Sequence, residues 1–352
     1  MKNILKIIED KFSQAYIQAG YPLLPITKFI REPMRWYFHL SPLLRHDTKI
    51  YLKPYLLERL HSLLVKEHPQ DFFIYHQQIK FRSFGSIMSI QAYYIGELEY
   101  HLVQYVQEQI CPNFVMLDIG AHHGAYSLIA AFELKKRGYK GVIHSFEPDP
   151  NNFSLLQYNI KQNELEDYIV LHNCAVGSHN CQEKLVIYPD NSGNFLASNP
   201  DTIDSIEKEE NSIEVEVIKL DDYLINLSTV TLIKMDIQGA EPLALLGAKE
   251  LIKQYQPIIV TEAMQHLQST EEVKNILLHQ YSYTICGVKT NGELSPLDSP
   301  EIFVSWDWVA LPQKTNVISS LQQLESSKQG KIKKNLAKKK SFGLSSKRSV
   351  GK

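Results

Sequence analysis

A buried stretch that passes from a strand through a glycine turn into a helix constrains this chain more than any other feature. It runs from Val115 to Ser127 and reads VMLDIGAHHGAYS. Its first part is apolar, and Gly120 and Gly124 bracket a short turn before the helix begins. An open α/β sheet presents backbone N–H groups to a nucleotide-like ligand in this way. The stretch therefore predicts an α/β fold with a ligand site at the carboxyl end of this strand.

Strand-like and helix-like segments alternate after this stretch, which is typical of a parallel sheet covered by helices. We expect strands at 115–119, 142–146, 169–174, 232–235 and 258–261. We expect helices at 97–109, 126–137, 151–163, 242–255 and 273–280. The segments 283–288 and 302–311 are predicted to form a terminal hairpin at the sheet edge. An insertion between 177 and 232 holds two more expected strands, 184–188 and 214–220, which suit pairing with each other.

The 352 residues, 44% of them hydrophobic, suffice for one large domain and a smaller N-terminal piece. Residues 1–96 are predicted to form a small, mainly helical cap, because amphipathic helical periodicity at 4–16 and a leucine stripe at 55–66 alternate with prolines. Two short strands at 72–75 and 79–84 are expected within the cap. Residues 97–312 then form the main domain.

The tail, residues 313–352, has a different composition. From Ser326 onward it carries ten basic residues and no acidic one, so the remainder carries −12 against −2 for the whole chain. It holds few large apolar side chains, which predicts disorder. A basic tail suits contact with an anionic surface, although it also suits a solvated terminus with no partner.

Carboxylates stand at the carboxyl ends of four expected strands, at Asp118, Glu147, Asp236 and Glu262. Ligands of open α/β sheets bind at these ends. Charged groups are seldom buried unless they are paired, so we expect the four to face a cleft that holds a cation or sugar hydroxyls. Each one taken alone is also compatible with a helix cap, Asp236 in particular.

A dinucleotide is the first ligand to consider. Its G-x-G-x-x-G fingerprint places an acidic residue about 20 residues further on. Here the glycines are Gly120 and Gly124, and Glu147 lies 27 residues after Gly120. Asp118 stands directly before the turn, where it repels a pyrophosphate and attracts an ammonium or sulfonium group. A cationic adenosine ligand without phosphate fits better, and S-adenosylmethionine is the common one.

Four motifs in this order resemble the FkbM family of S-adenosylmethionine-dependent methyltransferases. They are LDIGAHHGxYS at 117–127, FEPDP at 146–150, AVG at 175–177 and KMDIQGAE at 234–241. The similarity spans roughly residues 97 to 312. It implies a class I methyltransferase (Rossmann-like) fold, a mostly parallel seven-stranded sheet with an antiparallel last strand and helices on both faces.

The resemblance also implies roles for individual residues. The turn from Asp118 to Gly124 is expected to hold the methionine part of the cofactor, Glu147 the ribose hydroxyls, and 173–176 the adenine rim. The cofactor-binding residues predicted in this way are Asp118, Gly120, His122, Gly124, Tyr126, Ser127, Glu147, Pro148, Asp149, Cys174, Ala175, Val176, Asp236 and Gln238.

Two positions depart from the family's pattern. His122 stands where Asn is usual, and Gln238 stands where Glu is usual in the Lys-x-Asp-x-Glu-Gly pattern. Glutamine keeps hydrogen-bonding capacity but loses a charge. If the usual Glu serves as a base or metal ligand, Asp236 or Glu262 must carry that role here. A non-catalytic descendant that still binds the cofactor is the alternative.

The expected reaction is in-line transfer of a methyl group to the hydroxyl of a sugar, a glycan or a small hydroxylated metabolite. Alignment of the two reactants and removal of the acceptor proton are the protein's main contributions. The predicted catalytic residues are Asp236, Glu262 and His266, with Asp236 as first choice of base by its position and the His122–His123 pair as a substitute. No metal is required, although Asp236 with Glu262 suits Mg²⁺.

Alternatives to this enzyme stay open. One is a scaffold protein whose tail and cap dock a partner, and a weaker one is a nucleic-acid methyltransferase, which rests mainly on the basic tail. The insertion is expected to set acceptor choice or to form an edge hairpin without contact to the acceptor. Four cysteines without C-x-x-C spacing, no secretory signal and no apolar run of ~18 residues predict a cytoplasmic location without a transmembrane segment.

Overall fold

The computed structural model describes residues 70–83, 100–187, 193–199, 211–223, 227–263, 267–288, 293–297 and 307–313. The expected helices at 4–16 and 55–66, the tail and His266 lie outside these residues. The predicted boundaries of cap, main domain and tail therefore stay predictions.

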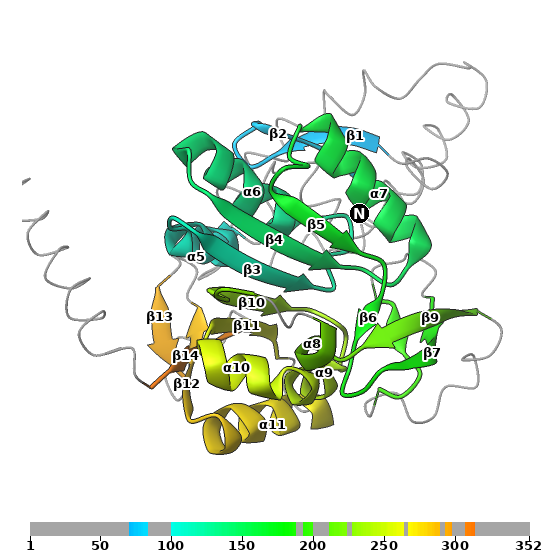
Figure 1. The fold of residues 1–352 in the computed structure, drawn as a ribbon, viewed down its shortest axis with the longest axis vertical. Helices are drawn as coiled ribbons and strands as arrows, with labels where there is room; N and C mark the ends of the chain where they lie inside the picture. The colour runs from blue at the N-terminus through cyan, green and yellow to red at the C-terminus, as the bar shows by residue number, and fades with distance from the viewer. Residues whose placement is uncertain are drawn as a thin grey trace, which may run out of the picture.

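The core is an eight-stranded sheet with the order β13-β12-β14-β11-β10-β3-β4-β5 (Figure 1). The five strands β11, β10, β3, β4 and β5 are parallel, and β14 runs antiparallel between β11 and β12. The strands are β3 (Phe114–Ile119), β4 (Gly141–Phe146), β5 (Ile169–His172), β10 (Leu232–Met235), β11 (Ile258–Glu262), β12 (Tyr283–Val288), β13 (Leu294–Pro296) and β14 (Asp307–Pro312).

This strand order confirms the predicted class I methyltransferase fold, because the first parallel strand β3 lies in the middle and β14 is antiparallel. One detail differs from the prediction. The segment between β12 and β14 adds the short strand β13 to the sheet edge, so the sheet has eight strands instead of seven. Leu294 sits opposite Val288 and packs against the core, which gives the extra strand an apolar anchor.

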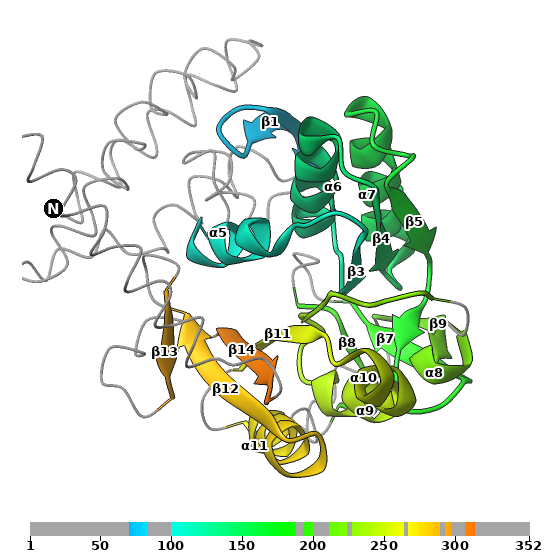
Figure 2. The same cartoon turned by 60° about the vertical axis from the view of Figure 1, so that its left-hand side comes forward.

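Helices cover both faces of this sheet (Figure 2). On one face lie α5 (Tyr100–Gln109), α6 (Ala125–Arg137) and α7 (Pro150–Gln162). On the other lie α8 (Leu220–Tyr223), α9 (Glu241–Gly247), α10 (Lys249–Tyr255), α11 (Gln268–Asn275) and the π-helical turn η3 (Ile276–Gln280). Along β3, Phe114 and Met116 pack into the first layer, whereas Leu117 and Ile119 pack into the second. Both faces of the strand are buried, as its continuous apolar run requires.

The expected helix at 242–255 is interrupted at Ala248, whose φ of −107° separates α9 from α10. Gly247 comes directly before the break, and glycine is among the residues least favourable in a helix. A Cβ at Gly247 would lie 1.9 Å from the carbonyl oxygen of Gly177. The break therefore lies where the helix approaches the backbone that follows β6 (Ala175–Val176).

The insertion after β5 forms a sheet of its own instead of an edge hairpin. The chain leaves the main sheet after His172, so the expected strand to Cys174 is two residues shorter. The second sheet has the order β6-β9-β7-β8, with β6 (Ala175–Val176), β7 (Cys181–Val186), β8 (Phe195–Leu196) and β9 (Ser212–Ile218). The predicted pairing within the insertion is confirmed, because β7 and β9 are antiparallel.

An N-terminal hairpin lies against the helices of the first face. It consists of β1 (Gln70–Ile74) and β2 (Ile79–Ser83), as the sequence predicts. The Tyr75 hydroxyl donates to Glu133 of α6 over 2.8 Å, and Arg137 donates to the same carboxylate. Burial raises the pKa of Glu133, but these hydrogen bonds outweigh burial, and its pKa lies below the ordinary value. The buried carboxylate thus ties the hairpin to the main domain.

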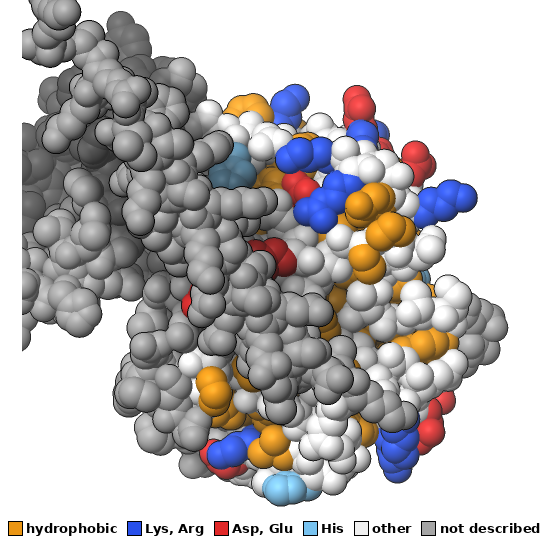
Figure 3. Space-filling view, turned by 90° about the vertical axis from the view of Figure 1, so that its left-hand side faces the viewer, with side chains coloured by type: hydrophobic (Ala, Val, Ile, Leu, Met, Phe, Trp, Pro, Cys, Tyr) orange, Lys and Arg blue, Asp and Glu red, His pale blue; other side chains and the backbone are white. Residues whose placement is uncertain are grey.

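The outer surface carries interspersed charges. On the face in Figure 3, basic side chains of the described residues lie beside acidic ones, with hydrophobic side chains scattered between them. Among the helices of the described residues, none has both the length and the apolar character that crossing a bilayer demands.

Replacing Tyr75 with Phe tests the hairpin anchor. We expect Tyr75→Phe to lower the free energy of unfolding by about 1 kcal/mol, because a buried carboxylate loses one donor. Urea denaturation at pH 7 measures the change. The matched control is Tyr158→Phe, whose ring lies at the surface under Arg82. Equal stability of Tyr75→Phe and the wild type would contradict the anchoring role.

Candidate active site

The glycine turn after β3 lies between the ends of the two neighbouring strands, β4 and β10. The N–H groups of Gly120 and Ala121 both donate to the carbonyl of Phe146, over 3.0 and 2.9 Å. On the other side, the N–H of Asp236 donates to the carbonyl of Ile119 over 3.1 Å. Gly120 has φ +78°, and a Cβ there would lie 2.1 Å from the carbonyl oxygen of Asp236. Only glycine permits both this conformation and this approach.

Glu147 follows β4 and points back to the turn. Its carboxylate accepts the N–H of His122 at Oε2 over 2.8 Å and the N–H of Asp149 at Oε1 over 3.0 Å. Burial raises the pKa of Glu147 to about 7, against the effect of these two hydrogen bonds. A carboxylate held in this way has a fixed orientation and keeps lone pairs for a ligand's hydroxyl groups.

Asp118 lies behind the turn in a fully buried position. Ser127 donates to its Oδ2 over 2.5 Å, and Lys234 Nζ lies 3.9 Å from its Oδ1. Oδ1 has no hydrogen-bond partner among the described residues. Burial raises the pKa of Asp118, although Lys234 and Ser127 oppose the shift. The Asp118 carboxyl group thus lies buried beneath the turn, between Ser127 and Lys234.

Asp236 and Glu262 lie on either side of the Gln238 amide. Gln238 Nε2 donates to Asp236 Oδ1 and to Glu262 Oε2, each over 3.0 Å. Burial and the neighbouring Asp236 raise the pKa of Glu262 to about 9. Burial also acts on Asp236, but Lys234, 3.5 Å away, and Gln238 hold its pKa below the ordinary value. The cluster therefore carries its charge on Asp236 and a proton on Glu262 at neutral pH.

The loop that carries Gln238 is held by two further side chains. Glu241 accepts the N–H of Ile237 over 2.8 Å and that of Gly239 over 2.9 Å. Asn199, from the second sheet region, donates to the carbonyl of Gln238. Gln238 itself has φ +53°, a conformation uncommon for a residue with a side chain. These contacts hold that conformation, which aims the amide at both carboxylates.

A cavity opens between the glycine turn, the ends of β4 and β10, the hairpin and the second sheet. Ten of the predicted cofactor-binding residues line it, namely Gly120, His122, Tyr126, Glu147, Pro148, Cys174, Ala175, Val176, Asp236 and Gln238. Lys234 is the single Lys or Arg in the described wall, against the carboxylates of Glu147 and Asp236. The cavity is therefore acidic on its polar side.

The remaining predicted site residues lie outside the described wall. Asp118, Gly124, Ser127 and Asp149 support the turn and α7 from behind, and Asp149 caps α7 by accepting from Asn151 over 2.7 Å. Glu262 lies next to Asp236 without lining the cavity. The structure thus brings Asp236 and Glu262 together and leaves the role of His266 a prediction.

Several residues that line the cavity come from distant segments and were not predicted from the sequence. Phe81 of the hairpin, Asn152 of α7, and Leu185, Asn194, Phe195 and Leu196 of the second sheet region also line the cavity. No motif marks them, because each reaches the site through tertiary packing. For the residues of the second sheet region, the sequence offered one indication, namely the expectation that the insertion sets acceptor choice.

Among the described residues, no group of three or more His, Cys, Asp or Glu side chains is arranged to hold a metal ion. The pair that the sequence suggested for Mg²⁺, Asp236 and Glu262, has the amide nitrogen of Gln238 between its two carboxylates. A hydrogen-bond donor occupies the place where a cation would need further oxygen ligands. The arrangement gives no support to a magnesium site.

Replacing Gly120 with Ala tests the close approach at the turn. We expect Gly120→Ala to lose about 1–3 kcal/mol more stability than Gly138→Ala, because an added Cβ overpacks the first site. Both glycines have positive φ, but a Cβ at Gly138 meets nothing within 4 Å. Thermal and urea unfolding of both variants measure the difference. Equal losses would show that backbone conformation alone requires glycine.

Comparison with known proteins gives the following likenesses. Residues 118–285 match the family described as the methyltransferase FkbM domain. Methyltransferase 1 of Beauveria bassiana (strain ARSEF 2860) is 27% identical over 147 residues, which are 38% of this chain and 57% of that protein. The structure of methyltransferase FkbM from Methylobacillus flagellatus KT is 19% identical with a TM-score of 0.38, covering 64% of this chain and 52% of that one.

A second solved structure, precorrin-6y C5,15-methyltransferase from Geobacter metallireducens GS-15, is 15% identical with a TM-score of 0.33, covering 61% of this chain and 87% of that one. The matches span little more than half the length of the Beauveria protein and of the FkbM structure. The resemblance carried by the four sequence motifs is confirmed by the family match. Residues 118–285 of this chain match the methyltransferase FkbM domain, and they contain or overlap all four motifs.

Proposed function

We propose that this protein is an S-adenosylmethionine-dependent methyltransferase that methylates a hydroxyl group of a sugar, a glycan or a small hydroxylated metabolite. The observation that carries the proposal is the convergence of the Gly120 turn, Glu147 and Asp236 on one acidic cavity. A scaffold protein or a nucleic-acid methyltransferase would use the same cofactor cavity, so the choice of acceptor rests on the resemblance to the FkbM family.

The charges of the cavity suit the cofactor. Glu147 and Asp236 line it, and Lys234 is the single Lys or Arg side chain in its described wall. The two carboxylates attract the cationic sulfonium and ammonium groups and repel a pyrophosphate. The fit therefore favours S-adenosylmethionine over a dinucleotide.

Different parts of the cavity wall suit different parts of the cofactor. Glu147, fixed by two backbone N–H groups, is placed to accept from both ribose hydroxyls. The apolar segment 174–176 and Pro148 lie beside it and suit the adenine ring. The Gly120 turn follows β3 and Asp236 follows β10, so both lie on the side of β4 away from β5. We assign this side to the methionine part and the acceptor.

When bound, S-adenosylmethionine supplies an activated methyl group. The chain's own residues then align the acceptor, exclude water and accept a proton. Asp236 is our candidate base, because its carboxylate lines the cavity and its depressed pKa keeps it ionised at neutral pH. Gln238 and Lys234 orient this carboxylate from two sides. Glu262 holds its proton beside Asp236, since its pKa is about 9.

The pH dependence of product binding tests the role of Glu147. S-adenosylhomocysteine hydroxyls bind the ionised carboxylate, and protonation near pH 7 competes with them. We expect the affinity to fall by up to about tenfold per pH unit below the pKa. Calorimetry at pH 6, 7 and 8 measures this. In Glu147→Gln the affinity should be weak and independent of pH, and an unchanged profile in this variant would contradict the assignment.

Replacing Asp236 with Asn separates binding from chemistry. We expect Asp236→Asn to retain binding of S-adenosylhomocysteine, which lacks the sulfonium charge, and to lose methyl transfer by about 10²–10⁴-fold, the usual contribution of a general base. Glu262→Gln, which mimics the protonated side chain, distinguishes the two carboxylates. Full activity of Asp236→Asn with loss of activity in Glu262→Gln would assign the base to Glu262 instead.

The acceptor is found by incubating purified protein with methyl-labelled S-adenosylmethionine and extracts of its own host. A labelled small hydroxylated compound supports the proposal, and label in nucleic acid overturns the acceptor class. Cofactor binding without any labelled product, in extracts that support transfer by another methyltransferase, favours the non-catalytic alternative.

A further inference from the structure

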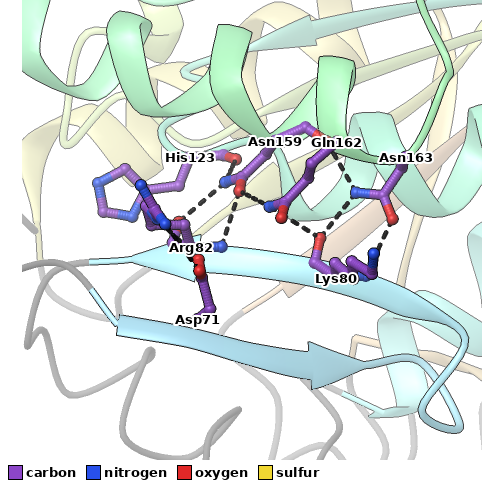
Figure 4. Close-up of polar contacts among 7 residues, drawn as sticks. All are labelled: Asp71, Lys80, Arg82, His123, Asn159, Gln162 and Asn163. Carbon is purple, nitrogen blue, oxygen red and sulfur yellow. Dashed lines mark hydrogen bonds and ion pairs between the residues drawn. The ribbon is translucent and has the colours of Figure 1, made fainter.

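The outer edge of strand β2 pairs with a helix instead of a strand (Figure 4). Asn163 of α7 accepts the N–H of Lys80 over 2.9 Å and donates to the carbonyl of the same residue over 2.7 Å. Asn159 does the same for Arg82, over 2.7 and 2.8 Å. Each side-chain amide therefore makes the two hydrogen bonds that a neighbouring strand would make.

The spacing of the two asparagines explains why this works. Residues four apart on a helix are separated by about 6 Å along its axis. Residues two apart on a strand are separated by about 6.6 Å. The spacing of the two asparagines on α7 therefore matches that of the two residues on β2, so that Asn159 faces Arg82 and Asn163 faces Lys80. Register and position of the hairpin on α7 are fixed by these four hydrogen bonds.

Asn159 also extends this contact into the glycine turn. Its Nδ2 donates to the carbonyl of His123 over 2.9 Å, in addition to the carbonyl of Arg82. Its Oδ1 accepts from Gln162 over 2.7 Å, in addition to the N–H of Arg82. The side chain is completely buried and all four of its hydrogen-bonding positions are used. One amide therefore joins hairpin, helix and turn.

The ring of His123 makes a second connection to the same turn. Its Nδ1 lies 2.7 Å from Ser83 Oγ at the end of β2, and its Nε2 lies 3.0 Å from Asn152 Oδ1 on α7. Asn152 Oδ1 can only accept, so Nε2 carries the proton and Nδ1 accepts from Ser83. Burial, followed by the neighbouring His122, lowers the pKa of His123 well below its ordinary value, in keeping with a neutral ring.

Both neighbours of this ring act on Glu147. His122, whose ring centroid lies 3.7 Å from that of His123, donates its N–H to Glu147 Oε2. The N–H of Asn152 donates to Asp149 Oδ1 over 3.4 Å, and the N–H of Asp149 donates to Glu147 Oε1 over 3.0 Å. Ser83, His123, Asn152 and Asp149 thus form a hydrogen-bonded series that ends at the Glu147 carboxylate. Phe81, two residues before Ser83, lines the same cavity.

From these contacts we infer that Ser83 and His123 are positioning residues for Glu147, and that the end of β2 at Ser83 is part of the cofactor-binding machinery. The inference rests on the proposed function, in which Glu147 holds the ribose hydroxyls. The hairpin does not touch the Glu147 carboxylate in any hydrogen bond among the described residues. It acts by fixing the groups that do.

Calorimetric titration of the full chain with S-adenosylhomocysteine tests this inference. We expect Ser83→Ala to weaken binding about fivefold, the effect of losing one buried hydrogen bond. Ser83→Thr, which keeps the hydroxyl, should restore the affinity. The matched control Asp71→Ala breaks the exposed ion pair with Arg82 on the same hairpin and should leave the affinity within about twofold of the wild type. If Ser83→Ala does not fold, Ser83→Cys takes its place.

Two readouts separate positioning from a loss of stability. In a Glu147→Ala background, Ser83→Ala should cause no further loss of affinity, because both changes act through one group. Ser83→Ala should also move the pH midpoint of binding upward, since the N–H groups of His122 and Asp149 are then less well positioned to stabilise the Glu147 carboxylate. Wild-type affinity in Ser83→Ala, or additive losses in the double variant, would overturn the inference. Wild-type affinity in Glu147→Ala would overturn the proposed function instead.

Discussion

The site depends on one close approach of backbone to backbone. The turn after β3 fits between the ends of β4 and β10, where Gly120 and Ala121 donate to Phe146 and Asp236 donates to Ile119. Gly120 has no side chain to separate these strands. Because the three strands are parallel, their following residues leave the sheet at the same edge. This contact brings Glu147 and Asp236 to one cavity.

Burial of several carboxylates then requires compensation, since an unpaired buried charge is costly. Two backbone N–H groups serve Glu147, and two more serve Glu241. Lys234 lies between Asp118 and Asp236. Glu262 retains a proton because burial and Asp236 raise its pKa to about 9. These contacts hold the polar side chains of the site in a fixed geometry, which suits catalysis by alignment.

Much of the fold follows from local pattern. The continuous apolar run at β3, the glycines that follow it and the alternation of strands and helices predict a mostly parallel sheet, and the structure confirms it. The differences lie where local signals are weak. Strand β13 has only three residues, and the break at Ala248 depends on the approach of Gly247 to the backbone at Gly177. The periodicity of the sequence does not predict such a contact between distant segments.

The sequence by itself determined which strand ends carry the site, because strand direction and the residue after each strand are local properties. The positions of Glu147 and Asp236 directly after their strands follow from it. Only the tertiary structure decided what surrounds them. Ser83 reaches His123 across 40 positions of the chain, and Gln238 reaches Glu262 across 24. Such contacts arise from packing of separate elements, whose relative positions depend on side-chain shape and burial throughout the molecule.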